Sequence, residues 1–531
     1  MALFELVIAL LFGAALLTML ARRFGLPYPT VLAVAGAALA VLPTGKAPVT
    51  LDPELALALF VAPVLLDAGF DTSLRDLRAN WAPVMSLVLF CVVVTVAAVA
   101  LVARALVPDM PWAVAIALGA IVAPPDATAA TAVLRLVSPP HRMLVILEGE
   151  SLLNDASALT IYRLAVLAAT GTSLGTWTVA PTLVMSAGGG CLLGYGLGRA
   201  LPWMFRRFDD IPVHIVTQFV STFAAWIFAD AIGASPVLTV VVYAMTLARS
   251  TALEQDAENR RHSFAVWDVA TYALNALAYI LMGLQLHTII RRTGGEGAFY
   301  LGFSLLVLLT VIVTRFGWVL LYNRGLALHR HVRRRRGVAD DGPEPTLATA
   351  AAVSWCGMRG IITLATALAL PGADVFPHRD LVVTAAFTVV LGTLLLQGTT
   401  LKPLMGWLGL HDEGEVGREE RLARRAGAEA ALRMLKGRHE AEAEPLRHEF
   451  QVRLEELTAD ATLSAATLAS LRMDAIATER RVIAKLRRNR TIGDAAYHTI
   501  EEELDLAEGH AAGRRRGGID DNPDDPPEAK G

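Results

Sequence analysis

Charged residues are scarce in most of this 531-residue chain. Asp, Glu, Lys and Arg make up only 18% of it, whereas 54% of its residues are hydrophobic. A typical soluble domain has about 25% charged residues. Of the 97 charged residues, 46 fall in the last 121 positions, so the first 410 carry about one charge in eight. This excludes a large soluble enzyme and predicts an all-α polytopic membrane protein with a polar C-terminal tail.

Cysteine is also rare, with Cys91, Cys191 and Cys356 all inside apolar stretches. That placement excludes a disulfide framework and a cysteine metal site. No pair of histidines forms a metal motif and the tail has no nucleotide-binding glycine motif, so no cofactor is expected. The apolar run from Phe4 has no basic segment before it, and we interpret it as a retained first span and not as a signal peptide.

Long apolar runs dominate the rest of the sequence. Because a spanning helix needs about 20 largely apolar residues, the sequence predicts thirteen spans in a transmembrane domain of residues 1–410. They lie at approximately 4–21, 28–44, 52–70, 82–106, 112–137, 143–170, 178–200, 211–232, 236–249, 264–286, 298–322, 346–370 and 382–406.

The loops between these spans give an orientation. Counted together with the basic residues within three positions of a span end, the odd-numbered loops have 18 Lys and Arg residues and the even-numbered loops have 5. Basic loops remain on the cytoplasmic side, so we expect the N-terminus outside the cell, the tail in the cytoplasm and the chain in the inner (plasma) membrane. Four arginines at 333–336 indicate an anchor for lipid headgroups and not a nucleic-acid site.

Two of the predicted spans are interrupted near their centres. In span 5, Pro124 and Pro125 must break or kink a helix, and Asp126 follows at a position suited to capping the second half. In span 12, Gly357 and Gly360 flank Arg359. The breaks are seven spans apart, which is the spacing of an inverted repeat in which spans 1–6 match 8–13. Paired interrupted helices indicate a transporter's binding site at the membrane midplane.

Span 6 opens with a cluster of ionisable residues, and charges inside a membrane are usually functional or paired. Glu150 needs a cation, and Arg359 is the partner that we expect for a structural ion pair. Asp155 has no comparable partner. A buried carboxylate is costly in its charged form unless a proton neutralises it or a cation stabilises it. One group that holds either ion, but not both, is the minimum machinery of an exchanger.

The other candidate ligands are oxygen-bearing residues near Asp155, because hard cations prefer oxygen. They are Ser151, Asn154, Asp126 and, with a weaker signal, Asp67 in span 3. We expect Asp155 to bind the monovalent cation. Weaker signals also come from polar or charged residues in other spans, namely Arg163, His214, Gln218, Asp230, Asp268, Asn275 and Arg315.

At this point the residues resemble a known family, the sodium/proton exchangers in the first branch of the monovalent cation:proton antiporters, bacterial type. The most specific match is the motif Glu148-Gly-Glu-Ser-Leu-Leu-Asn-Asp155. The supporting matches, in the family's order, are Leu65-Leu-Asp67-Ala-Gly-Phe70, Phe264-Ala-Val-Trp-Asp268 with Leu274-Asn275, and Ser354-Trp-Cys-Gly-Met-Arg-Gly360.

The resemblance implies a thirteen-span homodimer that exchanges Na⁺, or Li⁺ or K⁺, for H⁺ by alternating access. It implies that Asp155 is the shared cation and proton site, that Ser151 helps to coordinate and that Glu150 pairs with Arg359. In this family an Asn-Asp pair in span 6 goes with electroneutral exchange, so the resemblance also implies electroneutral exchange for Asn154 and Asp155. One departure concerns selectivity: many members carry Thr-Asp-Pro at the span-5 break, whereas Pro125 here offers no hydroxyl.

Alternatives remain open for the transported ion and for the class of membrane protein. K⁺/H⁺ exchange is the nearest alternative, followed by a cation channel and then by a membrane-embedded enzyme. The last would need a nucleophile or metal set, and Ser151 has no His or Lys at a suitable helical spacing.

We expect residues 411–512 to form a cytoplasmic helical tail and residues 513–531 to be disordered.

Overall fold

The chain is helical throughout the part that the computed structural model describes, and no strand occurs in that part. The described residues are 2–41, 53–134, 137, 139–171, 176–205, 210–251, 257–293, 296–336, 346–412, 414–436, 438, 443–458, 462–489, 500–501 and 503–509. Contacts divide the chain into two units, Met1–His411 and Asp412–Gly531. The expectation of disorder at 513–531 lies outside the described residues.

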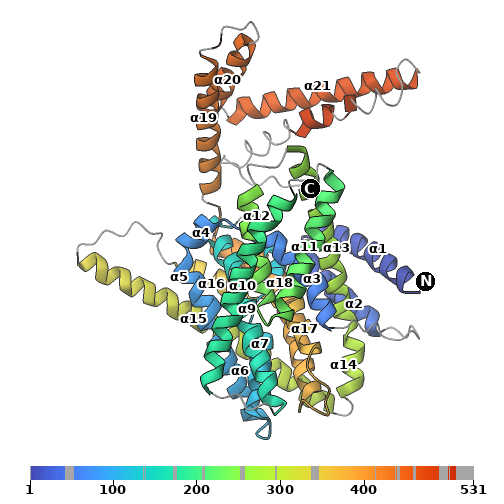
Figure 1. Ribbon diagram of the computed structural model, residues 1–531, viewed down its shortest axis with the longest axis vertical. Coiled ribbons are helices and arrows are strands. Elements are labelled where there is room, and N and C mark those ends of the chain that lie inside the picture. The colour runs from blue at the N-terminus through green and yellow to red at the C-terminus, as the bar shows by residue number, and fades with distance from the viewer. Residues whose placement is uncertain are drawn as a thin grey trace. The chain divides into compact units, whose positions relative to one another are not determined.

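The first unit is a bundle of apolar helices (Figure 1). Its elements are α1 (Ala2–Arg23), α2 (Tyr28–Val41), α3 (Pro53–Asp71), α4 (Leu74–Ala79), α5 (Trp81–Met85), the π-helix η1 (Ser86–Cys91), α6 (Val92–Leu106), α7 (Trp112–Val122), α8 (Ala127–Leu134), α9 (His141–Ala169), α10 (Thr176–Phe205), α11 (Ile211–Ala231), α12 (Pro236–Thr251), α13 (Ala257–Leu284), α14 (Leu286–Thr293), α15 (Gly297–Arg335), α16 (Leu347–Trp355), α17 (Ile361–Leu368) and α18 (Arg379–Leu408).

The second unit contains the polar helices α19 (Glu415–Leu435), α20 (Ala443–Thr458) and α21 (Thr462–Arg488). Short-range ion pairs between Arg and Glu occur on α19 and α20, such as Arg425 with Glu429 at 2.9 Å. The spacing of four residues places such partners on one helix face, where each pair adds a few tenths of a kcal/mol.

The predicted all-α membrane fold is confirmed, and each of the thirteen expected spans is occupied by one, two or, in the fourth span, three consecutive helical elements. In the described residues, seven helices are individually long and apolar enough to cross a membrane, and three shorter apolar helices accompany them. The halves of the two broken spans are too short to qualify alone. The count of thirteen therefore stays a prediction.

Small residues allow the helices of the first unit to approach closely. On α10, Gly190, Gly194 and Gly198 repeat every fourth residue and face α12. A Cβ atom at Gly190 would lie 2.9 Å from the carbonyl oxygen of Ser235. Apolar side chains gain little from leaving an apolar bilayer, so this backbone approach is how such helices obtain their packing energy.

Helix α9 lies between two hydrophobic cores and positions the residues of span 6. Its Leu147 and Ala158 belong to a core that α6, α7 and α18 help to form. Its Leu152 and Ala156 belong to a second core with α3, α11 and α12. Because α9 is packed on both sides, its polar residues between Glu150 and Asp155 are held inside the protein.

Candidate ion-binding site

The first helix break lies where the two prolines predicted it. Helix α7 ends at Val122 and α8 begins at Ala127. Asp126 caps α8, because its Oδ1 accepts a hydrogen bond from the backbone N–H of Thr128 at 2.9 Å and another from the Thr128 hydroxyl. The capping role expected from the sequence is confirmed, and the carboxylate faces the positive end of the α8 dipole.

The second break separates α16, which ends at Trp355, from α17, which begins at Ile361. It crosses the first break: the backbone N–H of Asp126 donates to the carbonyl oxygen of Met358 at 2.7 Å. A Cβ atom at Gly360 would collide with the Asp126 carboxylate. Glycine is thus the residue that lets this carboxylate approach the start of α17 as well as α8.

Arg359 neutralises the opposite ends of the broken helices. Its Nε donates to the carbonyl oxygen of Val122 at 3.0 Å and its Nη2 to that of Ala123 at 3.2 Å, while Nη1 donates to Gly357. The prolines leave the α7 carbonyls without helical partners, and a cation is favourable at a helix C-terminus. Asp126 and Arg359 together therefore compensate the dipoles of the crossing.

Glu150 corrects one of the expectations from the sequence. Its carboxylate binds Arg315 of α15 in a bidentate pair, with N–O distances of 2.5 and 2.8 Å, and both side chains are 2% exposed. Arg315 also donates to the carbonyl oxygen of Val353 in α16 at 3.2 Å. Arg359 pairs with no carboxylate in the described part of the chain. The fork of Arg315 reaches Glu150 because α15 packs against α16 and η1, whereas Arg359 is committed to freed carbonyls.

Asp155 is five residues beyond Glu150 on the same helix, but its charge is not compensated in the way that Arg315 compensates Glu150. Asp155 is 3% exposed, and no hydrogen bond or ion pair to its carboxylate occurs among the described residues. Asp126 is close enough to act on it electrostatically. A buried carboxylate without a cation or donor is strongly unfavourable in its charged form, so this position requires a proton or an external cation.

Asn154 supplies a second oxygen without a partner. Its Nδ2 donates to the carbonyl oxygen of Pro125 at 3.2 Å, so the side chain is fixed against the first break. Its Oδ1 is buried and accepts no hydrogen bond from any residue that the structure describes. Ser151, half-buried, and Pro125 line a narrow void that has no room for a water molecule. Asn154 and Ser151 are thus placed at the break, as expected from their spacing.

Asp67 and the weaker candidates are distributed more widely. Asp67 is half-buried on α3, which packs on α9. Arg163 and Asp230 form an exposed ion pair at 2.7 Å, which fits a structural or interfacial role. Gln218 accepts a hydrogen bond from the Trp267 indole at 2.8 Å.

Asn275 on α13 is 7% exposed, and its buried Oδ1 accepts no hydrogen bond within the described part of the chain. His214 is half-buried and Asp268 is exposed. Among the described residues, no group of three His, Cys, Asp or Glu side chains is arranged to hold a metal ion.

The sequence did not predict a role for Tyr279 or Thr128. The Tyr279 hydroxyl donates to Asp126 Oδ2 at 2.9 Å and lies 3.2 Å from the Thr128 hydroxyl. A signal was available, because Asp268, Asn275 and Tyr279 recur at positions that share one face of α13. Thr393 was also missed, and it accepts a hydrogen bond from the backbone N–H of Arg359 at 3.0 Å.

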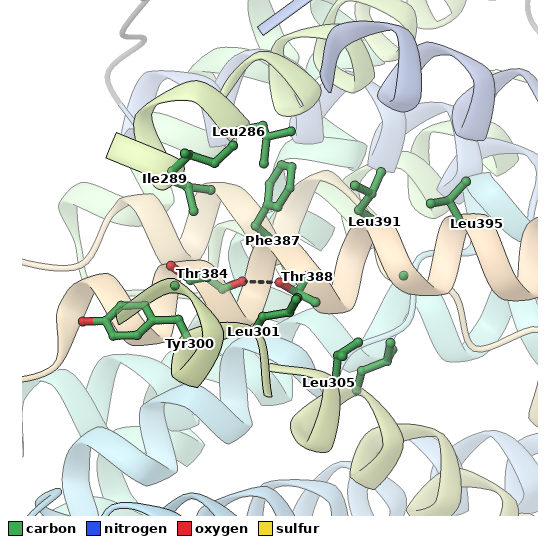
Figure 2. Close-up of a pocket in the computed structure, with 14 residues that line it drawn as sticks. Leu286, Ile289, Tyr300, Leu301, Leu305, Thr384, Phe387, Thr388, Leu391 and Leu395 are labelled. Atoms are coloured by element: carbon green, nitrogen blue, oxygen red, sulfur yellow. Dashed lines mark hydrogen bonds between the residues drawn. The ribbon is translucent and has the colours of Figure 1, made fainter. Parts of the chain in front are cut away.

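A larger cavity of about 530 Å³ lies away from these residues, between α14, α15 and α18. Figure 2 shows that its labelled lining is mostly aliphatic, with Leu286, Ile289, Phe387 and Leu391 among the side chains around it. The Thr388 hydroxyl is already used by the carbonyl oxygen of Thr384 at 2.8 Å. The lining residues include three hydroxyl groups but no acid, so this mostly apolar cavity is not a candidate for the ion site.

Comparison with known families gives an independent line of information. The sequence profile described as "Sodium/hydrogen exchanger, transmembrane" matches residues 6–407. The uncharacterised Na(+)/H(+) exchanger YjcE of Escherichia coli (strain K12) is 32% identical, over 77% of this chain and 77% of the relative. The sodium, potassium, lithium and rubidium/H(+) antiporter of Bacillus pumilus (strain SAFR-032) is 31% identical, over 72% of this chain and 58% of the relative.

A solved structure shares the fold. The sodium proton antiporter MjNhaP1 of Methanocaldococcus jannaschii, determined at pH 8, superposes with a TM-score of 0.59. The superposition covers 76% of this chain and 98% of MjNhaP1, at 15% sequence identity. At that identity the likeness establishes the arrangement of helices alone.

Proposed function

This chain belongs to the sodium/hydrogen exchanger family, and from that premise we propose that it exchanges a monovalent cation for a proton at Asp155. The resemblance expected from the motifs is confirmed. The chain is a multi-pass membrane transporter and not an enzyme, and its relatives support cation/proton antiport. The identity of the cation and the role of each residue belong to the proposal.

The observation that carries the proposal is the difference in compensation among three acids near the helix crossing, of which Glu150 and Asp155 are buried and Asp126 is half-buried. Glu150 has a guanidinium and Asp126 has three donors, whereas Asp155 has no hydrogen-bond or ion-pair partner among the described residues. A carboxylate in that state takes up a proton or a cation, and binding one excludes the other. Competition for a single group couples the two ions without any further component.

Oxygen atoms suitable for a cation lie on the residues around Asp155. Asn154 Oδ1 is buried and has no hydrogen-bond partner in the described residues, and Ser151 lies one helical turn before Asp155 on the same face. Together with the Asp155 carboxylate, they form a set of oxygen ligands that contains one acid. Such a set suits a hard monovalent cation, and we propose Na⁺ as the substrate, with Li⁺ possible at the same site.

K⁺/H⁺ exchange is the second candidate. The relative from Bacillus pumilus is named for sodium, potassium, lithium and rubidium. Pro125 provides no hydroxyl beside Asp126, whereas many family members have a threonine there. The site therefore has one oxygen fewer than theirs with which to favour the smaller Na⁺ ion over K⁺. A channel is disfavoured, because a single competing carboxylate is unnecessary for a continuous pore.

The remaining features of the proposal concern how exchange is carried out. One acid at Asp155 beside the amide of Asn154 supports electroneutral one-for-one exchange. Alternating access would expose Asp155 to each side of the membrane in turn.

We propose that the protein acts as a homodimer in the plasma membrane, with its N-terminus outside and its tail in the cytoplasm, in contact with membrane lipid.

The test is the collapse of a pH gradient in sealed vesicles that contain the full chain. NaCl, LiCl and KCl are added separately, and Asp155→Asn serves as the inactive variant. We expect cation-dependent collapse in the wild type, its loss in Asp155→Asn, and no change when the membrane potential is clamped. Wild-type exchange in a folded Asp155→Asn protein would refute the assignment of Asp155.

A further inference from the structure

Tyr279 connects α13 to the ion site through one well-defined hydrogen bond. The residue is completely buried at 0% exposed, and its hydroxyl donates to Asp126 Oδ2 at 2.9 Å. The same hydroxyl oxygen lies 3.2 Å from the Thr128 hydroxyl. A buried hydroxyl that donates to a carboxylate forms one of the stronger hydrogen bonds in proteins.

This bond completes the occupation of the Asp126 carboxylate. Oδ1 accepts two hydrogen bonds from Thr128, and Oδ2 accepts the one from Tyr279. Any cation that approaches Oδ2 must compete with the positive end of that hydroxyl dipole. Asp155 has no such competitor among the described residues. The two acids therefore differ in how available they are to a cation, and among the described side chains Tyr279 is the only hydrogen-bond donor to the Asp126 carboxylate that comes from outside the broken span.

We propose that Tyr279 is a positioning residue of the ion site, which holds Asp126 Oδ2 away from the transported cation and leaves Asp155 as the single exchanging acid. This inference rests on the proposed function. It assigns to α13 a part in setting cation affinity. It also gives a chemical reason why two neighbouring acids need not bind two ions.

The test compares Tyr279→Phe with a matched control, Tyr243→Phe. Tyr243 is also 0% exposed, and its hydroxyl lies 2.8 Å from that of Ser221 on α11, in a different core. Each substitution removes one buried hydroxyl, but only the first touches Asp126. Vesicle exchange at alkaline pH gives the half-saturating Na⁺ concentration and the maximal rate of each protein, and thermal unfolding gives its stability.

We expect Tyr279→Phe to lower the half-saturating Na⁺ concentration by about tenfold, because a competing hydrogen bond of roughly this strength is removed. The maximal rate should change by less than about twofold, and Tyr243→Phe should leave the half-saturating concentration as in the wild type. Adding Asp126→Asn to Tyr279→Phe should abolish the tenfold effect, because the two residues act through one bond. An unchanged or raised half-saturating concentration in folded Tyr279→Phe would overturn the inference.

A second variant tests the inference if Tyr279→Phe does not fold. With Tyr279 in place, Asp126→Asn should raise the half-saturating Na⁺ concentration by less than about tenfold, because Asp126 is already withheld from the cation. Loss of exchange as complete as in Asp155→Asn would contradict this. The proposed function has a separate test, the loss of exchange in Asp155→Asn. If exchange is lost in that variant while the results expected for Tyr279→Phe and Asp126→Asn are not observed, only the role of Tyr279 is refuted.

Discussion

Glu150 and Asp155 are two acids on one helix, five residues apart and equally buried, yet their surroundings differ completely. Glu150 is bound by both terminal nitrogens of Arg315, whereas Asp155 has no hydrogen-bond or ion-pair partner in the described residues. A compensated charge contributes to the structure, and an uncompensated one remains available for chemistry. Burial alone therefore does not identify a functional acid in a membrane. The informative property is whether positive charges and hydrogen-bond donors already contact the carboxylate.

The largest effect should come from removing the compensation of Glu150. Arg315→Ala leaves a buried carboxylate without a cation and should destabilise the protein by about 3–5 kcal/mol. The control is Arg163→Ala, because Arg163 forms an ion pair whose side chains are 49% and 51% exposed. That pair should contribute less than about 1 kcal/mol. Thermal unfolding in detergent measures both, and equal stability of the two variants would contradict the account.

A double-mutant cycle sharpens the comparison by asking which arginine Glu150 uses. Glu150→Gln and Arg315→Met should show a coupling energy of about 1–3 kcal/mol, as contacting residues do. The coupling of Glu150→Gln with Arg359→Met should be clearly smaller, because Arg359 donates to carbonyl oxygens of Val122 and Ala123. Unfolding of the single and double variants supplies the values. A larger coupling to Arg359 would restore the pairing that the sequence favoured.

A smaller effect should follow from crowding the helix crossing. Gly360→Ala introduces a Cβ atom that collides with the Asp126 carboxylate. We expect a loss of about 1–3 kcal/mol together with slower exchange, because Asp126 must move. Gly302→Ala in α15 is the control, since its Cβ meets nothing within 4 Å. The prediction fails if the two alanine variants unfold and transport alike.

The smallest effect concerns an acid outside the membrane-spanning segments, Asp76 on α4. Partial burial acts to raise the pKa of Asp76, but hydrogen bonds from Ser73, Arg75 and His141 lower it overall. A lowered pKa stabilises the folded state above the ordinary carboxylate value of about 4, and this contribution is lost as the pH falls through the lowered value.

Asp76→Asn should therefore cost about 0.5–1 kcal/mol at neutral pH and progressively less in acid. Thermal unfolding of both proteins across that range checks the sign. A difference that grows as the pH falls would contradict it.

The fold and the two breaks were accessible from the sequence because their causes are local. Apolar runs of spanning length, two consecutive prolines and two glycines around an arginine act within their own segments. Asp126 as a helix cap follows from the same local chemistry.

The pairing of Glu150 was not accessible. Arg315 and Arg359 are both arginines in apolar spans, and only tertiary packing brings one of them to Glu150. Tyr279 was missed because a tyrosine in an apolar helix resembles any other aromatic residue until its hydroxyl is placed.

The most direct test of the contrast between the two acids is Na⁺-dependent stabilisation at alkaline pH. A ligand that binds only the folded state raises its stability by RT ln(1 + [L]/Kd). In the absence of Na⁺, Asp155→Asn should be at least as stable as the wild type, because an uncompensated acid is removed, while Glu150→Gln should be less stable. Adding Na⁺ should stabilise the wild type and leave Asp155→Asn unchanged. Stabilisation of Asp155→Asn by Na⁺ to the same extent as the wild type would contradict the assignment of Asp155 as the ion site.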